Sequence, residues 1–416
     1  MNICKNGYVY NNLLGEYVER VKKEVILPSF LNLELNTLKS YFKGETIVPV
    51  FRIFVLRNDE TVNYEISEYV TDASFESSKQ NGQVKSMSIT LSNYDNHWKY
   101  GAKKNIKEGM KLRLDCGAVI DNILYWVTQG TFLVKEPNFS GDISSNKVSL
   151  SLCDKWGLWD GNVYGNTELK TIIPTQVPIN QVFDTIVHEN NGVDNNSMWD
   201  TKEILFDMGC SGYNTFYTIK QDAGQKKSEL LLDMAKTIAA DTFYDSKGHM
   251  RIRSNMLDFK NANYAPIWRF EEGDMDCSMP TLKYNKSKYF NKITTKGAIV
   301  NGYQFTATIE NKNKHSLYNV YDNPVTPKTN KNTKLFSDQL CLEQCMYEMV
   351  QQSRGMMSVS LNCAYLPFLE IDRVVYLNFP SLGIYNEEFV IDSISYGLKT
   401  DCRMSLSLTS NNEVIF

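Results

Sequence analysis

The stretch Val84-Lys85-Ser86-Met87-Ser88-Ile89-Thr90-Leu91-Ser92 alternates large apolar residues with small hydroxyl residues. Successive side chains of a strand point to opposite faces, so this pattern predicts a strand with one face in a core and a hydroxyl-lined face opposite. The alternation occurs four times, twice early and twice late. The copies are Met87–Leu91, Val148–Leu152, Met357–Leu361 and Met404–Leu408. A duplication would give two related β domains in one chain; convergence of short strands is the alternative.

Outward from the first copy, residues 46–154 consist of short apolar segments with turn residues between them, which predicts one β-barrel or sandwich domain. The clearest expected strands are Ile47–Leu56, Val84–Ser92, Met110–Asp115, Ile123–Val134 and Lys147–Cys153. The residues before this domain, 1–45, predict a helical extension. Its apolar residues recur at three- and four-residue spacing until Pro28, namely Leu13, Leu14, Tyr17, Val18, Val21 and Val25.

Residues 155–285 mix the two periodicities and predict an α+β middle domain. The expected helices are Thr167–Ile173, Pro178–Glu189 and Ser228–Ala240, the last of them capped by Ser228. A hairpin is expected over Phe243–Ile252, with Gly248 supplying a positive φ in its turn.

Residues 286–416 predict a second β domain with one helix. A strand at Asn291–Thr295 precedes a polar segment, His315–Lys334, which we expect to be an exposed and mobile loop. A helix at Ser337–Gln352 follows, and then strands to the end. The fold class expected is therefore mainly β, with two β domains around an α+β insert.

Composition excludes several classes of protein. The 416 residues carry a net charge of −4 and a pI near 5.8, which argues against a sequence-independent nucleic-acid binder. No apolar run is long enough to predict a signal peptide or a membrane span. The nine cysteines have irregular spacing and no Cys-x-x-Cys pair, so we expect reduced thiols in a protein made in a cytoplasm.

The sequence predicts no catalytic, cofactor-binding or metal-binding residue, and no enzyme activity, because no known catalytic motif occurs in it. An acidic cluster, Glu271, Glu272, Asp274 and Asp276, could hold calcium, although a solvated turn is favoured since the spacing fits no EF-hand. Cys341 and Cys345 share a helix face and could supply half a metal site, although core packing is favoured.

Three other groups have a functional and a structural interpretation. His188 and His249 lack an evident carboxylate or cysteine partner and are expected to be structural. Trp156 and Trp159 could bind sugar, but anchoring between domains is favoured. A basic stretch could contact single strands, but one alternating edge strand explains it better. Its residues are Lys283, Tyr284, Lys286, Lys288, Tyr289, Phe290, Lys292 and Lys296.

From about Val48 onward, the order of segments resembles the central hub proteins of phage tails and phage-tail-like particles. The segments that carry the resemblance are Ile66–Val70, the strand end Leu91–Asn93, Gly109–Leu114, Gly130–Val134, Val148–Asp154, Glu229–Ala235, Phe243–Gly248, Pro367–Val375 and Glu388–Ser395. These are patterns of residue class, and their order is the argument. The helical extension before Ile47 has no counterpart in the family pattern.

The resemblance implies a structural hub of a contractile-type tail or related injection system, present as a homotrimer. Each chain would contribute two tail-tube-like β-barrel domains, so that three chains meet a six-fold tail tube and a three-fold spike. The implied partners are the tail tube, spike, other baseplate and tape measure proteins, with passive passage of DNA through a channel that the hub lines and without membrane insertion. Its place would be the virion tail or a tail-like particle assembled in the cytoplasm of the host bacterium. Because the chain ends at Phe416 without an added enzyme domain, we expect the spike and any cell-wall enzyme to be separate chains.

Two other functions stay open. A carbohydrate-binding or glycan-cleaving tail protein could use the six tryptophans and scattered carboxylates. A hexameric distal tail ring protein would share the β-rich pattern and differ in copy number.

Overall fold

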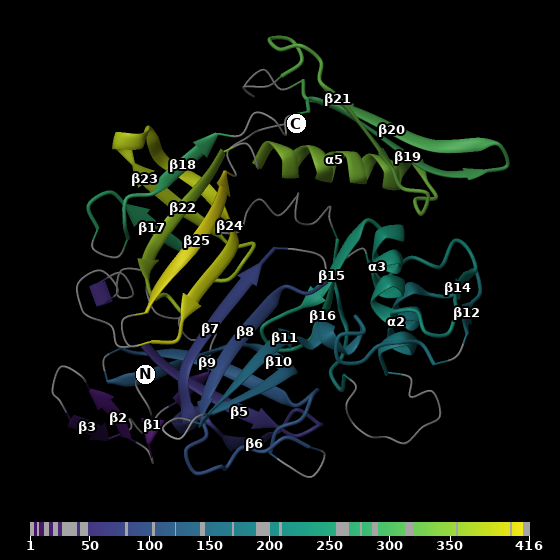
Figure 1. Ribbon diagram of the computed structural model, residues 1–416. Helices are drawn as coiled ribbons and strands as arrows, with labels where there is room; N and C mark the ends of the chain where they lie inside the picture. The colour runs from purple at the N-terminus through teal and green to yellow at the C-terminus, as the bar shows by residue number, and fades with distance from the viewer. Residues whose placement is uncertain are drawn as a thin grey trace.

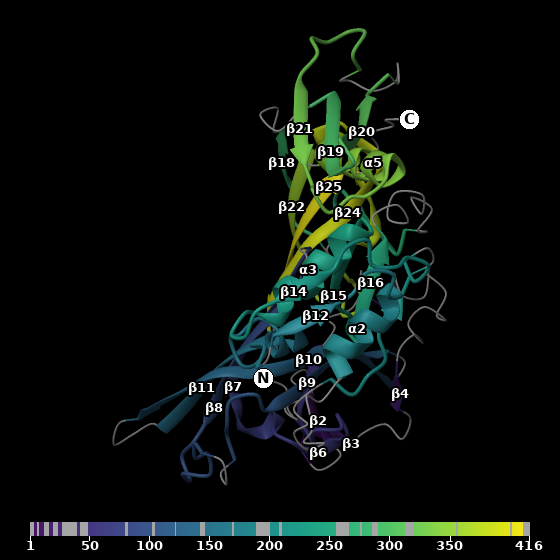
Figure 2. The same cartoon turned by 90° about the vertical axis from the view of Figure 1, so that its right-hand side faces the viewer.

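A computed structural model describes residues 4–5, 8–11, 16–19, 24–26, 40–41, 49–79, 82–101, 105–120, 122–141, 146–168, 170–188, 200–207, 210–254, 266–274, 277–284, 290–312, 319–354, 357–399 and 402–410. The chain is mostly β, which confirms the predicted fold class. Figures 1 and 2 show an elongated molecule. The strands of residues 49–154 lie at one end, and the sheet and helix formed by residues 292–354 lie at the other.

The first β domain is an antiparallel sheet in which the strands neighbour one another in the order β7-β8-β11-β10-β9-β5-β6. These strands are β5 (Pro49–Leu56), β6 (Val62–Glu65), β7 (Val70–Ser78), β8 (Lys85–Ser92), β9 (Lys111–Ile120), β10 (Ile123–Gly141) and β11 (Asn146–Asp154), with a short helix η2 (Ser67–Tyr69). In β8 the alternation acts as expected, because Met87, Ile89 and Leu91 are buried while Ser88 is exposed. All five strands expected in this part of the sequence are present.

The second β domain has the order β18-β22-β25-β24, and β24 also pairs with β23, which pairs with β17. Its strands are β17 (Trp268–Glu271), β18 (Thr281–Tyr284), β22 (Met357–Ala364), β23 (Val374–Phe379), β24 (Ile384–Gly397) and β25 (Arg403–Ser410), with a short helix η5 (Pro380–Leu382). The two late copies of the alternation form β22 and β25, which are hydrogen-bonded to each other, as β8 and β11 are.

The two β domains form one sheet. The last residues of β24 pair with β7, from Ser393↔Ser78 to Gly397↔Ser74, so the strands belong to a single 14-stranded sheet (Figure 1). A single apolar core also spans both domains: the Phe75 ring lies 4.9 Å from the Tyr396 ring and 6.2 Å from the Phe132 ring. Each such buried aromatic stabilises the fold by roughly 1.5–3 kcal/mol. The domains are therefore fixed relative to each other.

The middle domain packs two helices against short strands around its own core. Its elements are η3 (Lys155–Leu158), β12 (Thr171–Ile173), α2 (Ile179–His188), β13 (Leu205–Phe206), β14 (Ile219–Gln221), α3 (Lys227–Thr237), β15 (Ala240–Tyr244) and β16 (Met250–Ser254). The β15–β16 hairpin confirms the sequence prediction, with Gly248 at φ 81°. Helix α2 is also confirmed.

Two local predictions for this domain are wrong. The segment expected as a helix over Thr167–Ile173 contains strand β12, because its Thr-Ile-Ile run consists of β-branched residues and Pro174 follows. Ser228 does not cap α3. The helix begins at Lys227 behind the cap position Lys226, which makes no side-chain capping bond.

A further unit of one helix and three strands lies next to the second β domain, and its helix contacts β22 and β25 (Figure 1). Helix α5 (Asp338–Arg354) lies on the sheet β20-β19-β21, formed by β19 (Lys292–Val300), β20 (Tyr303–Glu310) and β21 (Pro327–Lys331). The sequence predicts a mobile loop over His315–Lys334. This prediction is wrong for Pro327–Lys331, because these residues form β21, which pairs in parallel with β19. The Asn291 side chain fixes the approach of this strand by accepting from Thr326 N and donating to Pro324 O.

The helical extension expected over residues 1–45 is wrong for the described residues 4–5, 8–11, 16–19 and 24–26, which form strands. The elements there are β1 (Cys4–Lys5), β2 (Tyr8–Asn11), β3 (Glu16–Glu19) and β4 (Glu24–Ile26). The Tyr-Val-Tyr and Tyr-Val sequences of β2 and β3 favour strands, since aromatic and β-branched residues fit a pleated surface. Strand β4 pairs in parallel with β10, which adds it to the large sheet. None of the described helices is long and apolar enough to cross a membrane.

Candidate functional site

The outer face of the large sheet is the candidate site. Register shows that one face runs unbroken over eight strands, β18-β22-β25-β24-β7-β8-β11-β10, because directly opposed residues of paired strands share a face. The opposed pairs are Thr281↔Ser360, Ser360↔Ser407, Ser393↔Ser407, Ser395↔Ser405, Ser395↔Glu76, Ser74↔Ser88, Ser88↔Ser151 and Ser149↔Asn138. We call this surface the hydroxyl face.

Small polar groups on the hydroxyl face bond to one another across strands. Ser74 and Ser88 hydroxyls lie 2.8 Å apart, and the Ser405 hydroxyl donates to Asn362 Oδ1 at 2.7 Å. A shallow hollow of about 290 Å³ lies over β22, β24 and β25 and is lined mainly by these hydroxyls. Short hydroxyl side chains leave the backbone plane nearly bare, so the face is smooth and hydrophilic.

Charges on the hydroxyl face are few and of both signs. The exposed acids are Asp72, Glu76 and Glu136, and the exposed bases are Lys147, Lys283, Lys399 and Arg403. One of the acids, Asp72, has Lys399 3.7 Å away. The face therefore carries no concentrated positive charge with which a polyanion could form many contacts.

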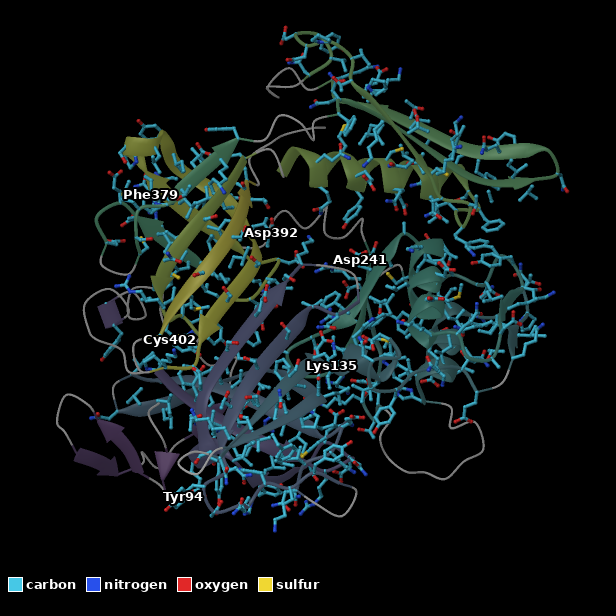
Figure 3. All side chains as sticks on the ribbon, in the orientation of Figure 1. Tyr94, Lys135, Asp241, Phe379, Asp392 and Cys402 are labelled. Carbon is cyan, nitrogen blue, oxygen red and sulfur yellow. The ribbon has the colours of Figure 1, made fainter. Side chains whose placement is uncertain are left out.

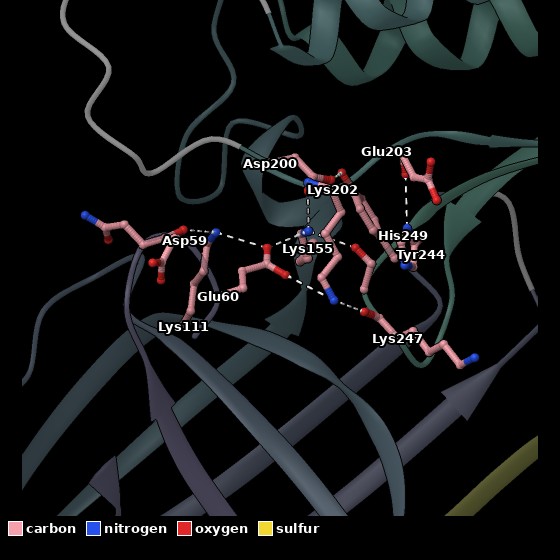
Figure 4. Close-up of polar contacts among 12 residues, drawn as sticks. Asp59, Glu60, Lys111, Lys155, Asp200, Lys202, Glu203, Tyr244, Lys247 and His249 are labelled. Atoms are coloured by element: carbon pink, nitrogen blue, oxygen red, sulfur yellow. Dashed lines mark hydrogen bonds and ion pairs between the residues drawn. The ribbon is translucent and has the colours of Figure 1, made fainter. Parts of the chain in front are cut away.

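A buried network of charged residues holds the middle domain against the first β domain (Figure 4). Lys155, with 0% exposure, lies at its centre: Nζ donates to Asp200 Oδ1 and to the Gly248 carbonyl at 2.8 Å, and lies 2.6 Å from Glu60 Oε1. Glu60 sits in the β5–β6 turn and also pairs with Lys111 Nζ at 3.1 Å. Four segments distant in sequence meet at this one ammonium group.

The network is completed by neutral donors and mutual charge effects. Tyr244 Oη donates to Asp200 Oδ2, and Trp159 Nε1 donates to Tyr244 Oη, both at 2.8 Å. Burial alone would raise the pKa of Glu60, but the nearby Lys155 and Lys111 charges outweigh it and lower that pKa below its ordinary value. Glu60 is therefore ionised in the folded protein at neutral pH, as the pairing requires.

A second buried contact holds the C-terminal β domain in place. Asp372 accepts from Arg253 Nη1 of β16 at 2.5 Å and lies 2.6 Å from Lys79 Nζ, at the end of β7. All three domains meet here, around a pocket of about 190 Å³. The Asp372 contact fixes the second β domain against the first β domain and the middle domain, and so supports the continuity of the hydroxyl face.

The described residues of the acidic and cysteine candidates make structural contacts. Glu271 pairs with Arg269 Nε at 3.2 Å and Glu272 accepts from Ser381 N at 3.0 Å, while Asp276 lies outside the described residues. No cluster of three or more metal-ligating side chains occurs in the described ranges. Cys341 and Cys345 are buried in separate apolar clusters, and burial raises the pKa of both thiols, that of Cys341 to about 11.

The histidines and the basic stretch need correction. His188 does have a carboxylate partner, Asp184 Oδ1 at 2.6 Å, one helical turn away, whereas His249 Nδ1 contacts the Glu203 carbonyl. The basic stretch is not one strand. Its described lysines are divided between β18 and β19, in different sheets, and residues 285–289 lie outside the described part.

Tryptophans are structural wherever they are described. Trp156 and Trp159 pack into the middle-domain core together with Leu133 and Cys153 of the first β domain, which is the anchoring role expected. Trp98, Trp126 and Trp268 are each 1% exposed. The sixth, Trp199, lies outside the described residues. A sugar-binding platform needs an exposed ring face, and none of these five supplies one.

Sequence reasoning missed both the hydroxyl face as a single surface and the Lys155 network. Four alternating strands were visible, but their order in the sheet depends on the long-range β24·β7 pairing, which leaves no local signal. Lys155 follows Asp154 at a strand end and looks like an ordinary surface lysine. The burial of Lys155 becomes evident only from the position of Asp200, a residue that the sequence analysis does not single out.

Comparison with solved structures decides the fold. The tail protein from Neisseria meningitidis MC58 superposes with a TM-score of 0.58 at 10% identity, covering 88% of this chain and 98% of that one. The chain has the fold of phage tail proteins. The 43 kDa tail protein of prophage MuSo2 from Shewanella oneidensis gives a TM-score of 0.54 at 14% identity, over 86% and 97% of the two chains.

A chain of the Francisella PdpA–VgrG complex shares this fold, with a TM-score of 0.51 at 11% identity over 93% of this chain and 62% of that one. No family model matches the sequence, and no curated protein does. At these identities the likeness establishes the tail-protein fold.

Proposed function

We propose that this chain is a structural hub of a phage tail or tail-like particle, and that three copies form a ring whose channel is lined by the hydroxyl face. The ring joins a six-fold tail tube to a three-fold spike. The tail-protein fold supports the assignment to a tail, and the joined β domains support the symmetry. Each chain contributes two β domains, so three chains present six.

The single observation that carries the proposal is the pairing of β24 with β7. Through Ser395↔Glu76 and its neighbours, the hydroxyl face passes from one β domain to the next without a break. A channel wall built from β domains requires such a join at every domain boundary. The chain makes one of these joins within itself, and contacts between chains supply the others.

The chemistry of the face suits a channel for DNA. The whole chain carries a net charge of −4, whereas the described face has exposed side chains of both signs, three acids and four bases. DNA phosphates do not adhere to this wall because the described face carries short hydroxyl side chains and no concentrated positive charge. DNA and the tape measure protein pass along such a wall without stable contacts.

We further propose that the chain has no enzymatic activity and acts through its partners: the tail tube, spike and other baseplate proteins of a contractile-type particle. It is assembled into the particle in the bacterial cytoplasm. The glycan-binding alternative finds no support among the described tryptophans, which are buried.

The test places cations on the proposed wall. Ser88→Lys/Ser405→Lys changes two exposed positions on the hydroxyl face, and Gln181→Lys, an exposed position on α2, is the matched control. We expect the wild-type assembly not to bind duplex DNA, and the double variant to bind it with a steep salt dependence, because three chains add six cations to one channel. Electrophoretic mobility shift at 50 and 200 mM salt measures this.

The double variant should form an assembly of the same mass as the wild type, because in the proposed ring the hydroxyl face lies away from the contacts between subunits. Equal DNA binding by Gln181→Lys and the double variant would contradict the channel assignment. A double variant that no longer assembles would place the hydroxyl face between subunits.

A further inference from the structure

Cys277 and Cys363 lie directly opposite each other at one edge of the second β domain. They form an antiparallel bridge between β22 and the segment that connects β17 to β18. The adjacent Ser278 N donates to Asn362 O at 2.8 Å, which makes the two cysteines a non-hydrogen-bonded pair. In such pairs the Cα atoms are about 4.5 Å apart and the side chains are on the same face.

Both side chains point to the apolar core. Cys363 is a fully buried member of the core cluster, and Cys277 is partly buried and packs against it. A disulfide requires Cα atoms roughly 4.4–6.8 Å apart and Cβ atoms that face each other. The usual geometry of a non-hydrogen-bonded antiparallel pair falls within this range, and Cys277 Sγ, now 3.6 Å from the Glu271 carbonyl oxygen, must turn toward Cys363 for the bond to form.

We propose that Cys277 and Cys363 are a disulfide-forming pair, closed by a small-molecule disulfide such as oxidised glutathione when the protein leaves a reducing compartment. The structure holds both as thiols. Cys277 is the residue that meets the oxidant, because it is partly exposed whereas the other described cysteine side chains are buried. The inference is independent of the proposed function.

The reaction proceeds in two exchanges. The Cys277 thiolate attacks one sulfur of oxidised glutathione, forming a mixed disulfide and releasing one glutathione thiolate. The Cys363 sulfur, on losing its proton, then attacks the Cys277 sulfur and expels the second glutathione. The two cysteines lose two protons and two electrons in total, and one glutathione disulfide becomes two glutathione thiols.

The bond strengthens an exposed edge of the sheet. Strand β18 lies at the end of the strand order and is hydrogen-bonded only to β22 among the described strands. Sheet edges open more readily than interiors, because their backbone groups are half unpaired. A covalent link four residues before β18 ties that edge to β22.

Thiol mapping of the full-length wild-type protein is the test. The folded protein is incubated with oxidised glutathione or with dithiothreitol, then denatured, alkylated and digested. We expect the oxidised sample to show two fewer alkylated cysteines and a peptide that links Cys277 to Cys363. Cys277→Ser abolishes this peptide, and the matched control Cys341→Ser, at a buried helix position, retains it.

Thiol mapping of the wild-type protein tests the proposal even if a variant fails to fold. Full alkylation of Cys277 and Cys363 after oxidation, a persistent glutathione adduct on Cys277, or a link between two other cysteines would each overturn the proposal.

Discussion

Replacement of Lys155 by methionine tests whether the buried ionic network holds the middle domain in place. Methionine has a similar length and no charge, so the change removes the ammonium group with little loss of volume. The group contacts the Asp200 and Glu60 carboxylates and the Gly248 carbonyl. After the change Glu60 keeps Lys111, whereas Asp200 keeps Tyr244 Oη and the Lys202 N–H but has no cation among its described contacts.

The expected loss in the free energy of unfolding follows from these lost and retained contacts. A buried carboxylate that loses its cation destabilises a protein by about 3–5 kcal/mol. Two lost charge-assisted hydrogen bonds at roughly 1.5–3 kcal/mol each lead to the same range. The matched control is Lys170→Met, because Lys170 pairs with Asp222 at 3.3 Å on the surface, with side chains 58% and 74% exposed. That pair should contribute at most about 1 kcal/mol.

Urea unfolding followed by tryptophan fluorescence measures both variants, and Trp159 reports on the network through its bond to Tyr244. We expect Lys155→Met to lower the free energy of unfolding by several times the loss in Lys170→Met. Equal, small losses in the two variants would refute the reasoning, because they would show that the network is not desolvated in solution.

Three further predictions concern the pH dependence, the core and the backbone. The lowered pKa of Glu60 stabilises the fold above about pH 4.5, the ordinary value of this pKa, and the stabilisation is lost as the pH falls through the pKa of the folded state. Thermal melts from pH 3 to 7 should therefore show a smaller loss of stability toward acid in Glu60→Gln than in the wild type, and parallel curves would contradict this prediction. Leu406→Asp should prevent folding by burying an unpaired carboxylate, whereas Ser407→Glu on the hydroxyl face should keep the wild-type circular dichroism spectrum. Gly165→Ala should destabilise far more than Gly224→Ala in urea unfolding, because a Cβ at Gly165 would lie 2.3 Å from Trp159 Cα whereas the space at Gly224 is open, although both have positive φ.

How far the sequence predicts this fold depends on whether the signal is local. The alternation of Met87–Leu91 and its three counterparts identifies β8, β11, β22 and β25, since burial on one face imposes period two. The β15–β16 hairpin is predicted equally well because Gly248 is a local turn signal.

Predictions fail where two local signals compete or where the contacts are distant. Near the N-terminus the three- and four-residue spacing predicts a helix, but the described segments Tyr8–Asn11 and Glu16–Glu19, with their β-branched and aromatic residues, form strands. Strand β21 in a polar segment exists because β19 offers it an edge, and the β24·β7 pairing joins residues more than 300 positions apart. Neither contact leaves a pattern in the neighbouring sequence.

The number of chains in the assembly tests the central claim most directly. Mass photometry of the purified full-length protein, alone and with its tail partners, should find three copies, about 143 kDa for a chain of 47.8 kDa. A ring of six copies would contradict the trimeric hub and favour a distal tail ring protein, and a chain that stays monomeric with every tail component would contradict a hub of either kind.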